Sequence, residues 1–446
     1  MNGVGVIQLA WLLEPGFERY PDRRVTCEPM GAAANIDRRL DMLSTDETSD
    51  LAAIGVFGPN KSAPLHRWVS FTEGFSAQLV VSELATTSPD SLVLDPFGGT
   101  GTTPLVAAQL GFRSVWTEVN PYLREAAETK IAAACASPNL RRTVVRCLRE
   151  AALAGPKLPE VDFANPLLAA NRKRDYFTSD AARELVGWIE RFNDVDNELA
   201  RRIGRLAVAS SAISTSNMKR AVDLRRRTER ELLRARPTVL QTVRERVSDF
   251  IEDLETSSIA PGHASWIGAD ARSVGDDTRD VDLIVTSPPY LNGTNYCRNT
   301  KLELLLLGLI DSEEGLSQLR TRSLTAGINN VSRRIGEPTT LDFVEPVAAA
   351  LDQVAYDSRI PTMVRAYFSD MHRVFAELLG VTRAGGRLAL DIGDSRFAGV
   401  HVDTPTLLTE TAESAGWIHS GETMLRDRIS KDGSPLCQKL IYFKRP

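Results

Sequence analysis

The run Val93-Leu94-Asp95-Pro96-Phe97-Gly98-Gly99-Thr100-Gly101-Thr102-Thr103 decides the fold, because it joins a short apolar strand to a glycine-rich turn and the start of a helix. Glycines let the backbone approach a ligand closely, and a helix N-terminus favours a negatively charged group. A second predicted strand ends at Glu118, about twenty residues after Asp95, the spacing at which a βαβ unit holds a ribose. Pro104 stands where a dinucleotide site has its third glycine. The order strand, turn, helix, strand and acid predicts a nucleoside-cofactor site.

A second motif follows the apolar residues 281–285 and reads Thr286-Ser287-Pro288-Pro289-Tyr290. The two prolines fix φ and donate no backbone hydrogen bond, so the turn is stiff and rich in acceptors. It offers a hydroxyl, free carbonyls and an aromatic ring, which suit a flat group that carries an exocyclic amine. Taken alone, the same residues are also typical of an ordinary exit from a strand.

Both motifs together resemble the S-adenosylmethionine-dependent DNA amino-methyltransferases, over roughly residues 64–134 and 262–443. The resemblance implies a class I methyltransferase fold: a Rossmann-like α/β domain with a seven-stranded, mostly parallel sheet and a helical insert. It also implies that S-adenosyl-L-methionine is the cofactor. The Ser-Pro-Pro-Tyr form of the second motif is more frequent in cytosine-N4 enzymes, whereas adenine-N6 enzymes more often carry Asp or Asn at position 287.

The resemblance assigns roles to individual residues. Residues 66–76 resemble the segment that closes over the methionine end of the cofactor, although an amphipathic packing helix is an alternative interpretation. Asp270 matches the acid near the adenine amine, although an isolated Asp is also typical of a turn. The predicted cofactor-binding residues are Phe71, Thr72, Phe75, Ser76, Asp95, Pro96, Phe97, Gly99, Gly101, Thr102, Thr103, Glu118, Asn120, Asp270 and Thr286. The predicted catalytic residues are Ser287, Pro288, Pro289 and Tyr290.

The residue types of the second motif suit methylation of an exocyclic amine. Such an amine is a poor nucleophile because its lone pair is delocalised into the ring. The Ser287 hydroxyl and the Pro288 carbonyl would accept its two hydrogens, bias the nitrogen towards tetrahedral geometry and let its lone pair attack the sulfonium methyl group in line. Tyr290 offers a ring on which a base extruded from the duplex can stack. Positioning and electrostatics would supply the rate, without a covalent intermediate.

The chain divides into four predicted regions. Residues 1–62 read as an irregular N-terminal arm, and residues 63–134 as the cofactor-binding half of the methyltransferase domain. Residues 135–260 form an insert predicted to be helical throughout, because apolar residues recur every three or four positions. Residues 261–446 are the catalytic half, in which a helix is predicted to open at Tyr367 and residues 311–360 form a second insert.

The first insert is basic although the whole chain carries a net charge of −5. Residues 201–246 contain 13 Lys and Arg against four acids, and such crowding suits a partner that carries phosphates. A solvated, salt-bridged helix face is the alternative. We expect double-stranded DNA as the partner, and the candidate DNA-binding residues are Arg225, Arg226, Arg227, Arg230, Arg234, Arg333 and Arg334.

Several other chemistries do not fit the sequence. Cytosine-C5 methylation needs a thiolate, typically in a Pro-Cys pair, and no such pair occurs. The five cysteines and five histidines show no ligand spacing, so no metal is expected. No segment resembles a signal peptide or reaches transmembrane length, which predicts a cytoplasmic, nucleoid-associated protein without a membrane partner.

The expected function is site-specific cytosine-N4 methylation of DNA, as part of a restriction-modification or related defence system, with a restriction endonuclease as a candidate partner. Adenine-N6 methylation is the main alternative. An RNA or protein amide methyltransferase is disfavoured, because Asn usually opens the turn in those enzymes. The last alternative is a non-catalytic, S-adenosylmethionine-binding DNA-binding regulator.

Overall fold

The computed structural model describes residues 51–446, apart from residues 72–73, 160–174, 221–222, 235, 276, 292–293, 332–340 and 431. Of the predicted N-terminal arm, only residues 51–62 are therefore described. Thr72, Arg333 and Arg334 lie outside the described residues. Within the described residues, no helix combines the length and the apolarity needed to span a membrane.

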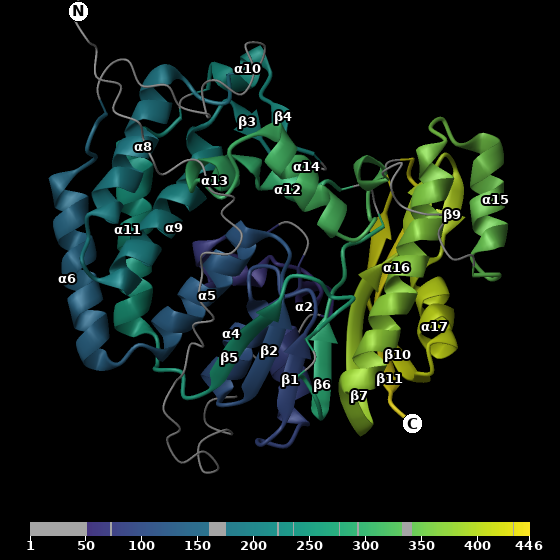
Figure 1. The fold of residues 1–446 in the computed structure, drawn as a ribbon. Helices are drawn as coiled ribbons and strands as arrows, with labels where there is room; N and C mark the ends of the chain where they lie inside the picture. The colour runs from purple at the N-terminus through teal and green to yellow at the C-terminus, as the bar shows by residue number, and fades with distance from the viewer. Residues whose placement is uncertain are drawn as a thin grey trace, which may run out of the picture.

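A seven-stranded sheet forms the centre of the molecule (Figure 1), with the strand order β10-β11-β7-β6-β1-β2-β5. Strands β5, β2, β1, β6 and β7 are parallel, and β11 is antiparallel to both β7 and β10. The predicted class I methyltransferase fold is thus confirmed. The strands are β1 (Leu92–Asp95), β2 (Arg113–Thr117), β5 (His263–Gly268), β6 (Val281–Thr286), β7 (Thr382–Gly393), β10 (Ile418–Ile429) and β11 (Pro435–Lys444).

Side chains alternate between the two faces of a strand, and here both sets are apolar. Both faces of the sheet are therefore covered by helices. Val93, Val285 and Ala389 belong to one apolar cluster, with helices α3 (Ala77–Ala85) and α4 (Thr102–Leu110). Their neighbours Leu94, Ile284 and Leu388 belong to a second cluster, with helices α16 (Arg359–Val381) and α17 (Thr404–Ser414). The chain order reverses between β1 and β6, and open α/β sheets bind ligands at the carboxyl ends of their strands at such a point.

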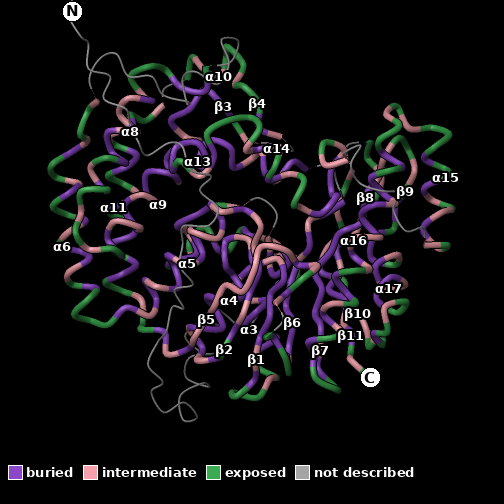
Figure 2. The backbone as a smooth tube through the Cα atoms, viewed as in Figure 1, coloured by how far each residue is buried: buried purple, intermediate pink, exposed green. Residues whose placement is uncertain are grey.

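The first insert packs beside helix α5 (Pro121–Cys135) as a third apolar cluster. Its helices bury one side and expose the other (Figure 2), as their three- and four-residue spacing predicts. They are α6 (Pro138–Ala154), α8 (Ser179–Asn193), α9 (Glu198–Thr215), α10 (Glu229–Leu232) and α11 (Val239–Thr256).

The prediction that the first insert is helical throughout is wrong. Strands β3 (Met218–Lys219) and β4 (Arg225–Arg226) pair as a short antiparallel ribbon between α9 and α10. Lys219 lies opposite Arg225, and Glu231 accepts a hydrogen bond from each of them. Successive side chains of a strand point to opposite faces, which separates the neighbouring arginines. The Glu231 carboxylate offsets the repulsion between the opposed Lys219 and Arg225.

The catalytic half carries further short elements above the sheet. Helix α16 begins at Arg359, so the predicted start at Tyr367 is wrong; Pro361 fits in the first helical turn, where a missing N–H costs little. The second insert contains α14, η4 and α15. The remaining elements are α2 (Leu51–Ile54), η2 (Pro59–Lys61), η3 (His66–Trp68), α12 (Tyr296–Asn299), α13 (Lys301–Leu306), α14 (Glu313–Arg322), η4 (Ile328–Asn330), α15 (Glu345–Val354), β8 (Ser395–Phe397) and β9 (Val400–Val402).

Asp253 of α11 fastens the first insert to the segment that leads to the cofactor half. Its carboxylate is 1% exposed and accepts hydrogen bonds from the Leu65 N–H at 2.7 Å, the Trp68 indole at 2.9 Å and the Arg67 guanidinium at 3.1 Å. Replacing it would leave buried donors and a partly buried cation without a partner, which costs about 3 kcal/mol or more.

We therefore expect Asp253→Ala to lower the midpoint of thermal unfolding by about 3 °C or more, as measured by differential scanning calorimetry. Glu252→Ala is the matched control, because the Glu252 side chain is 63% exposed although it also contacts Arg67. An equal, small shift for both variants would contradict the anchoring role of Asp253.

Candidate active site

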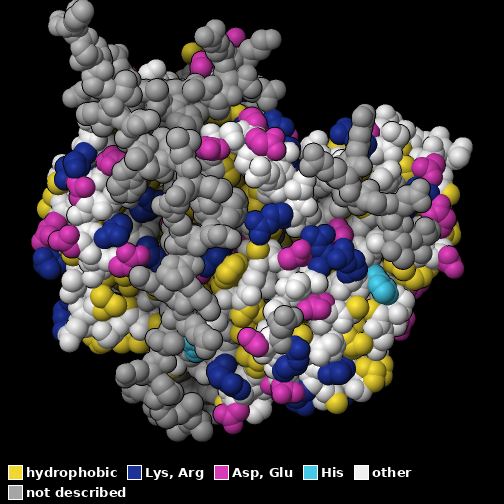
Figure 3. Space-filling view, viewed as in Figure 1, with side chains coloured by type: hydrophobic (Ala, Val, Ile, Leu, Met, Phe, Trp, Pro, Cys, Tyr) yellow, Lys and Arg dark blue, Asp and Glu magenta, His cyan; other side chains and the backbone are white. Residues whose placement is uncertain are grey.

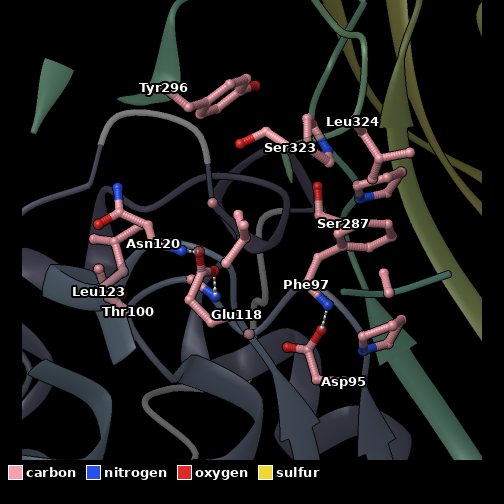
Figure 4. Close-up of a pocket in the computed structure, with 18 of the residues that line it drawn as sticks. Asp95, Phe97, Thr100, Glu118, Asn120, Leu123, Ser287, Tyr296, Ser323 and Leu324 are labelled. Atoms are coloured by element: carbon pink, nitrogen blue, oxygen red, sulfur yellow. Dashed lines mark hydrogen bonds between the residues drawn. The ribbon is translucent and has the colours of Figure 1, made fainter. Parts of the chain in front are cut away.

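A cavity that opens to solvent lies where β1, β2 and β6 end. Figure 4 shows that Glu118 and Ser287 reach it from different strands, with Tyr296 opposite them. Of the predicted site residues, the cavity is lined by Phe71, Phe75, Asp95, Pro96, Phe97, Gly99, Thr102, Glu118, Asn120, Asp270, Ser287, Pro288 and Pro289. Ser76, Gly101, Thr103, Thr286 and Tyr290 are not among the lining residues.

The glycine turn, residues 96–101, is held close to the neighbouring strand. The Gly98 N–H donates to the Thr117 carbonyl at 2.9 Å, and the Thr117 hydroxyl donates to the Pro96 carbonyl at 2.6 Å. Gly101 has a φ of +82°, and a Cβ atom there would lie 2.6 Å from the Cβ of Ala127. A side chain at position 101 would therefore be strained and would push α5 away from the turn.

Glu118 is positioned by the turn and by the start of α5. Its two carboxylate oxygens accept the N–H groups of Gly99 at 2.8 Å and Asn120 at 2.7 Å. Burial raises the pKa of Glu118 to about 7, and these backbone hydrogen bonds oppose the shift. Asn120 also caps α5 by accepting the Tyr122 N–H. A carboxylate with spare lone pairs at a cavity wall suits the hydroxyl groups of a ribose.

Asp95 joins the glycine turn to the catalytic turn, residues 286–290. Its Oδ1 atom accepts the Thr286 hydroxyl at 2.7 Å and the Phe97 N–H at 3.0 Å. Burial raises the pKa of Asp95 to about 6, against the hydrogen bonds that favour its ionised form. The Thr103 hydroxyl makes a parallel link by donating to the Val285 carbonyl at 3.2 Å. Thr286 and Thr103 therefore shape the cavity from behind its wall.

The catalytic turn is supported from below by a buried polar cluster. The Tyr290 hydroxyl donates to Asp391 Oδ2 at 3.1 Å and accepts from Gln438 Nε2 at 2.9 Å. Gln438 also donates to Asp391 Oδ1 at 2.7 Å. Burial raises the pKa of Asp391 to about 6, and hydrogen bonds from Gln438, Tyr290 and Ser287 oppose the shift. Ser287 thus lies beside both Asp391 and Tyr290, at the edge of this buried cluster.

The sequence predicts that the Tyr290 ring is open to a stacking base. In the free protein, however, the Tyr290 side chain does not line the cavity. The side chain is 7% exposed and stands behind Pro288 and Pro289, which line the cavity. Its N–H donates to the Tyr296 hydroxyl at 3.0 Å, which holds the two ends of the following loop together. The polar cluster under the turn accounts for this position, because it holds the phenol hydroxyl in the protein interior.

The segment before α3 brings Phe71 and Phe75 to the cavity. Ser76 is 1% exposed and precedes the first turn of α3 without lining the cavity. Asn60 donates to the Phe75 carbonyl at 3.1 Å and accepts the Ala77 N–H at 2.8 Å. Phe57 lines the cavity itself. Residues 54–60 therefore belong to the site, although they were predicted to lie in an irregular arm.

Asp270 lines the cavity but is bound by its own neighbour. Arg272 donates to Oδ1 at 2.9 Å and also pairs with Asp370 at 3.0 Å. Burial opposes ionisation, yet the hydrogen bonds and charge of Arg272 lower the pKa of Asp270. The cavity is also lined by residues that the sequence did not single out for the cofactor or the amine. They are Leu123, Ala269, Ala271, Tyr296, Cys297, Arg322, Ser323, Leu324 and Asn330.

The predicted DNA-binding arginines that the structure describes all lie in β4, α10 or their flanks. Arg226, Arg230 and Arg234 are exposed, and none forms an ion pair within the described residues. Arg225 is exposed but pairs with Glu231 at 2.8 Å. Arg227 is half-buried and donates to the carbonyls of Ser216 and Ile213, so its role is to close the end of α9. Lys and Arg side chains also gather near the middle of the face in Figure 3.

Comparisons with known proteins bear on this site. A model of N6- and N4-methyltransferases, described as DNA methylase, matches residues 77–129, which hold the glycine turn, Glu118 and Asn120. Type II methyltransferase M.BsoBI of Geobacillus stearothermophilus is 25% identical over 418 residues, or 80% of this chain and 79% of its own. M.AvaI of a Nostoc species is 24% identical over 443 residues, or 87% of this chain and 88% of its own.

Among solved structures, TrmN from Thermus thermophilus matches with 14% identity and a TM-score of 0.28, over 83% of this chain and 48% of that chain. The fold assignment rests on the strand order described above. In the described part of the chain, no group of three or more His, Cys, Asp and Glu side chains could hold a metal ion. The family match over residues 77–129 and the curated relatives support a DNA amino-methyltransferase of the N4/N6 family, whose members use S-adenosylmethionine.

Proposed function

We propose that the protein is a type II DNA methyltransferase that methylates the N4 amine of cytosine. The observation that carries the proposal is the position of Ser287, Pro288 and Pro289, which open into the same cavity as Glu118 and the glycine turn. An acceptor pair for an exocyclic amine thus faces a site for a nucleoside. M.BsoBI and M.AvaI, which are similar over most of the chain, are named type II methyltransferases.

The cavity chemistry fits S-adenosylmethionine. Glu118 offers acceptors for ribose hydroxyls, Asp270 offers one for an adenine amine, and Phe71 and Phe75 offer apolar surface. The bound cofactor supplies a methyl group on a positively charged sulfur. Asp95 and Thr286 tie the loop that holds this nucleoside to the loop that holds the amine, so the two reactants are oriented by one hydrogen-bonded unit.

Ser287 and Pro288 act on the amine only by accepting hydrogen bonds from its two hydrogens. In this mechanism the Ser287 hydroxyl, which lies beside Asp391, offers its oxygen to the cavity as one acceptor, and the Pro288 carbonyl is a second one. Two acceptors on the amine hydrogens localise the nitrogen lone pair and direct it into the cavity. As the amine becomes positively charged, the Ser287 oxygen and the nearby Asp391 carboxylate stabilise that charge.

Cytosine is proposed over adenine because Ser287 is neutral and short, as in the cytosine-N4 form of the turn. Adenine-N6 methylation uses the same fold and the same acceptors and is the second candidate. We also propose double-stranded DNA as the substrate, with Arg225, Arg226, Arg230 and Arg234 as phosphate contacts and Arg333 and Arg334 as further candidates. A restriction endonuclease would be the functional partner of such an enzyme.

The decisive experiment is to sequence DNA from a methylation-free host that expresses the chain, with a method that separates N4-methylcytosine from N6-methyladenine. We expect N4-methylcytosine at one short motif and its loss in a Pro288→Ala variant. N6-methyladenine would overturn the base assignment and keep the mechanism. Unmodified DNA, together with tight cofactor and DNA binding, would favour the regulator over the enzyme.

A further inference from the structure

Arg428 of β10 lies beside the catalytic turn with part of its hydrogen-bonding capacity unused. Its guanidinium carbon is 5.9 Å from the centroid of the Tyr290 ring. The Nη1 atom is buried and has no hydrogen-bond partner among the described residues. The neighbouring Arg426 differs, because it donates to Gln438 Oε1 at 2.7 Å. Arg428 therefore stands out on the β10–β11 hairpin as a cation placed over a functional ring without a protein acceptor for Nη1.

The space around Nη1 depends on a glycine at the end of β7. A Cβ atom at Gly393 would lie 2.4 Å from Arg428 Nη1 and 3.3 Å from Tyr290 Cε2. A side chain at position 393 would therefore displace the guanidinium. Because a buried N–H without an acceptor is unfavourable, and a guanidinium only donates, the arrangement suits a ligand that brings acceptors to this point.

We propose that Arg428 donates hydrogen bonds to the Watson–Crick edge of the target base after the base leaves the duplex, and so selects cytosine. This inference rests on the proposed function. The guanidinium carbon lies 5.9 Å from the centroid of the Tyr290 ring, next to the turn that carries Ser287 and Pro288. Neither Arg428 nor Tyr290 lines the cavity of the free protein, so the contact with the base requires the Arg428 side chain to swing towards the amine site when the base enters. Arg428 is half-buried at the hairpin, so its long side chain can move as the base enters.

The chemistry of the two candidate bases decides which one fits. Next to its exocyclic amine, cytosine presents two neighbouring acceptors, N3 and O2. Adenine presents one acceptor, N1, followed by a C–H group. With the amine held by Ser287 and Pro288, the fork of Arg428 would find two acceptors on cytosine and one on adenine. An adenine would leave a donor unpaired, and such a loss discriminates strongly between bases.

The test compares two unmethylated duplexes that contain the DNA motif found to be methylated in the host. One has cytosine at the target position and the other has an abasic site there. Binding is measured by fluorescence anisotropy with S-adenosylhomocysteine present. For Arg428→Gln we expect the affinity for the cytosine duplex, relative to the abasic duplex, to fall about 10- to 100-fold below the wild-type ratio. Arg428→Lys should show a similar fall, because it keeps the charge but loses the planar fork.

Lys439→Gln is the matched control, since it removes a positive charge from the same hairpin in a surface pair with Glu422. It should leave the ratio of the two affinities unchanged. Equal losses of affinity on both duplexes for Arg428→Gln would leave the ratio unchanged, would indicate a phosphate contact or misfolding, and would overturn the proposal. Wild-type affinity for both duplexes would also overturn it.

Failure of this inference can be separated from failure of the proposed function. N4-methylcytosine in the host DNA with an unchanged ratio overturns the role of Arg428 alone. N6-methyladenine overturns the two-acceptor argument. Unmodified DNA overturns both proposals together.

Discussion

Ser287→Ala should lower kcat for methyl transfer by about 10²- to 10³-fold, the usual cost of losing one preorganised polar contact to a developing charge. Ser287 lines the cavity beside the buried Asp391, so removal of its hydroxyl takes away an acceptor for the amine and leaves the cofactor wall intact. The affinity for S-adenosylmethionine should change less than about threefold. Single-turnover transfer of a labelled methyl group to plasmid DNA measures the first quantity, and isothermal titration calorimetry measures the second.

The matched control is Ser82→Ala, which removes a hydroxyl from the exposed side of α3. It should match the wild type in both measurements. Full methyl transfer by Ser287→Ala would show that the Pro288 carbonyl suffices, and would remove the main support for the proposed mechanism. A joint loss of cofactor affinity and transfer would instead indicate a collapsed cavity.

Glu118→Gln should weaken S-adenosylmethionine binding by about 10²-fold at pH 8, because a hydrogen bond to a charged acceptor contributes about 1.5–3 kcal/mol. The amide keeps one acceptor for the loop N–H groups of Gly99 and Asn120, so the fold of the turn should survive. Glu150→Gln on α6 is the control, since the Glu150 side chain is 63% exposed and remote from the cavity. A variant that binds the cofactor as tightly as the wild type would exclude Glu118 as the ribose acceptor.

The same residue predicts a pH dependence with a definite sign. Burial raises the pKa of Glu118 to about 7, and only the ionised carboxylate accepts both ribose hydroxyls. The affinity of the wild type should therefore rise between pH 6 and pH 8, and that of Glu118→Gln should rise less. The stability of the free protein should change with pH in the opposite direction. The contribution of Glu118 to the free energy of unfolding is complete below the pKa of Glu118 in the unfolded chain, and it is lost as the pH rises through about 7.

Local pattern was sufficient to predict strands β1, β2 and β6 and the two turns, whereas the seven-stranded sheet came from the family resemblance. Each of these strands is short and is followed by a turn or a polar residue, so Asp95, Glu118 and Thr286 could be placed at carboxyl ends. The side-by-side placement of β1 and β6 depends on the family topology, which the resemblance implied. The fold class was therefore predictable, and so was most of the cavity wall.

What the sequence did not predict depends on contacts between distant residues. Tyr290 and Asp391 are 101 positions apart, and nothing near the catalytic turn indicates that its tyrosine is held in the interior. Arg227 looked like its neighbours in an arginine run, but the carbonyls at the end of α9 fix it. The second insert has no strong periodicity, so Ser323, Leu324 and Asn330 gave no signal of a place in the cavity.

Residues 54–60 connect the two halves of the chain at the level of the main chain. The Ile54 carbonyl accepts the Ser76 N–H at 2.9 Å, the Gly55 carbonyl accepts Gln438 at 2.7 Å, and Asn60 holds Phe75. Gln438 in turn holds Tyr290 and Asp391. A cofactor that contacts Phe75 would thus act on the same stretch of backbone that supports Tyr290. We therefore expect the protein loaded with its methyl donor to present a stiffer receptor for the base than the empty protein does.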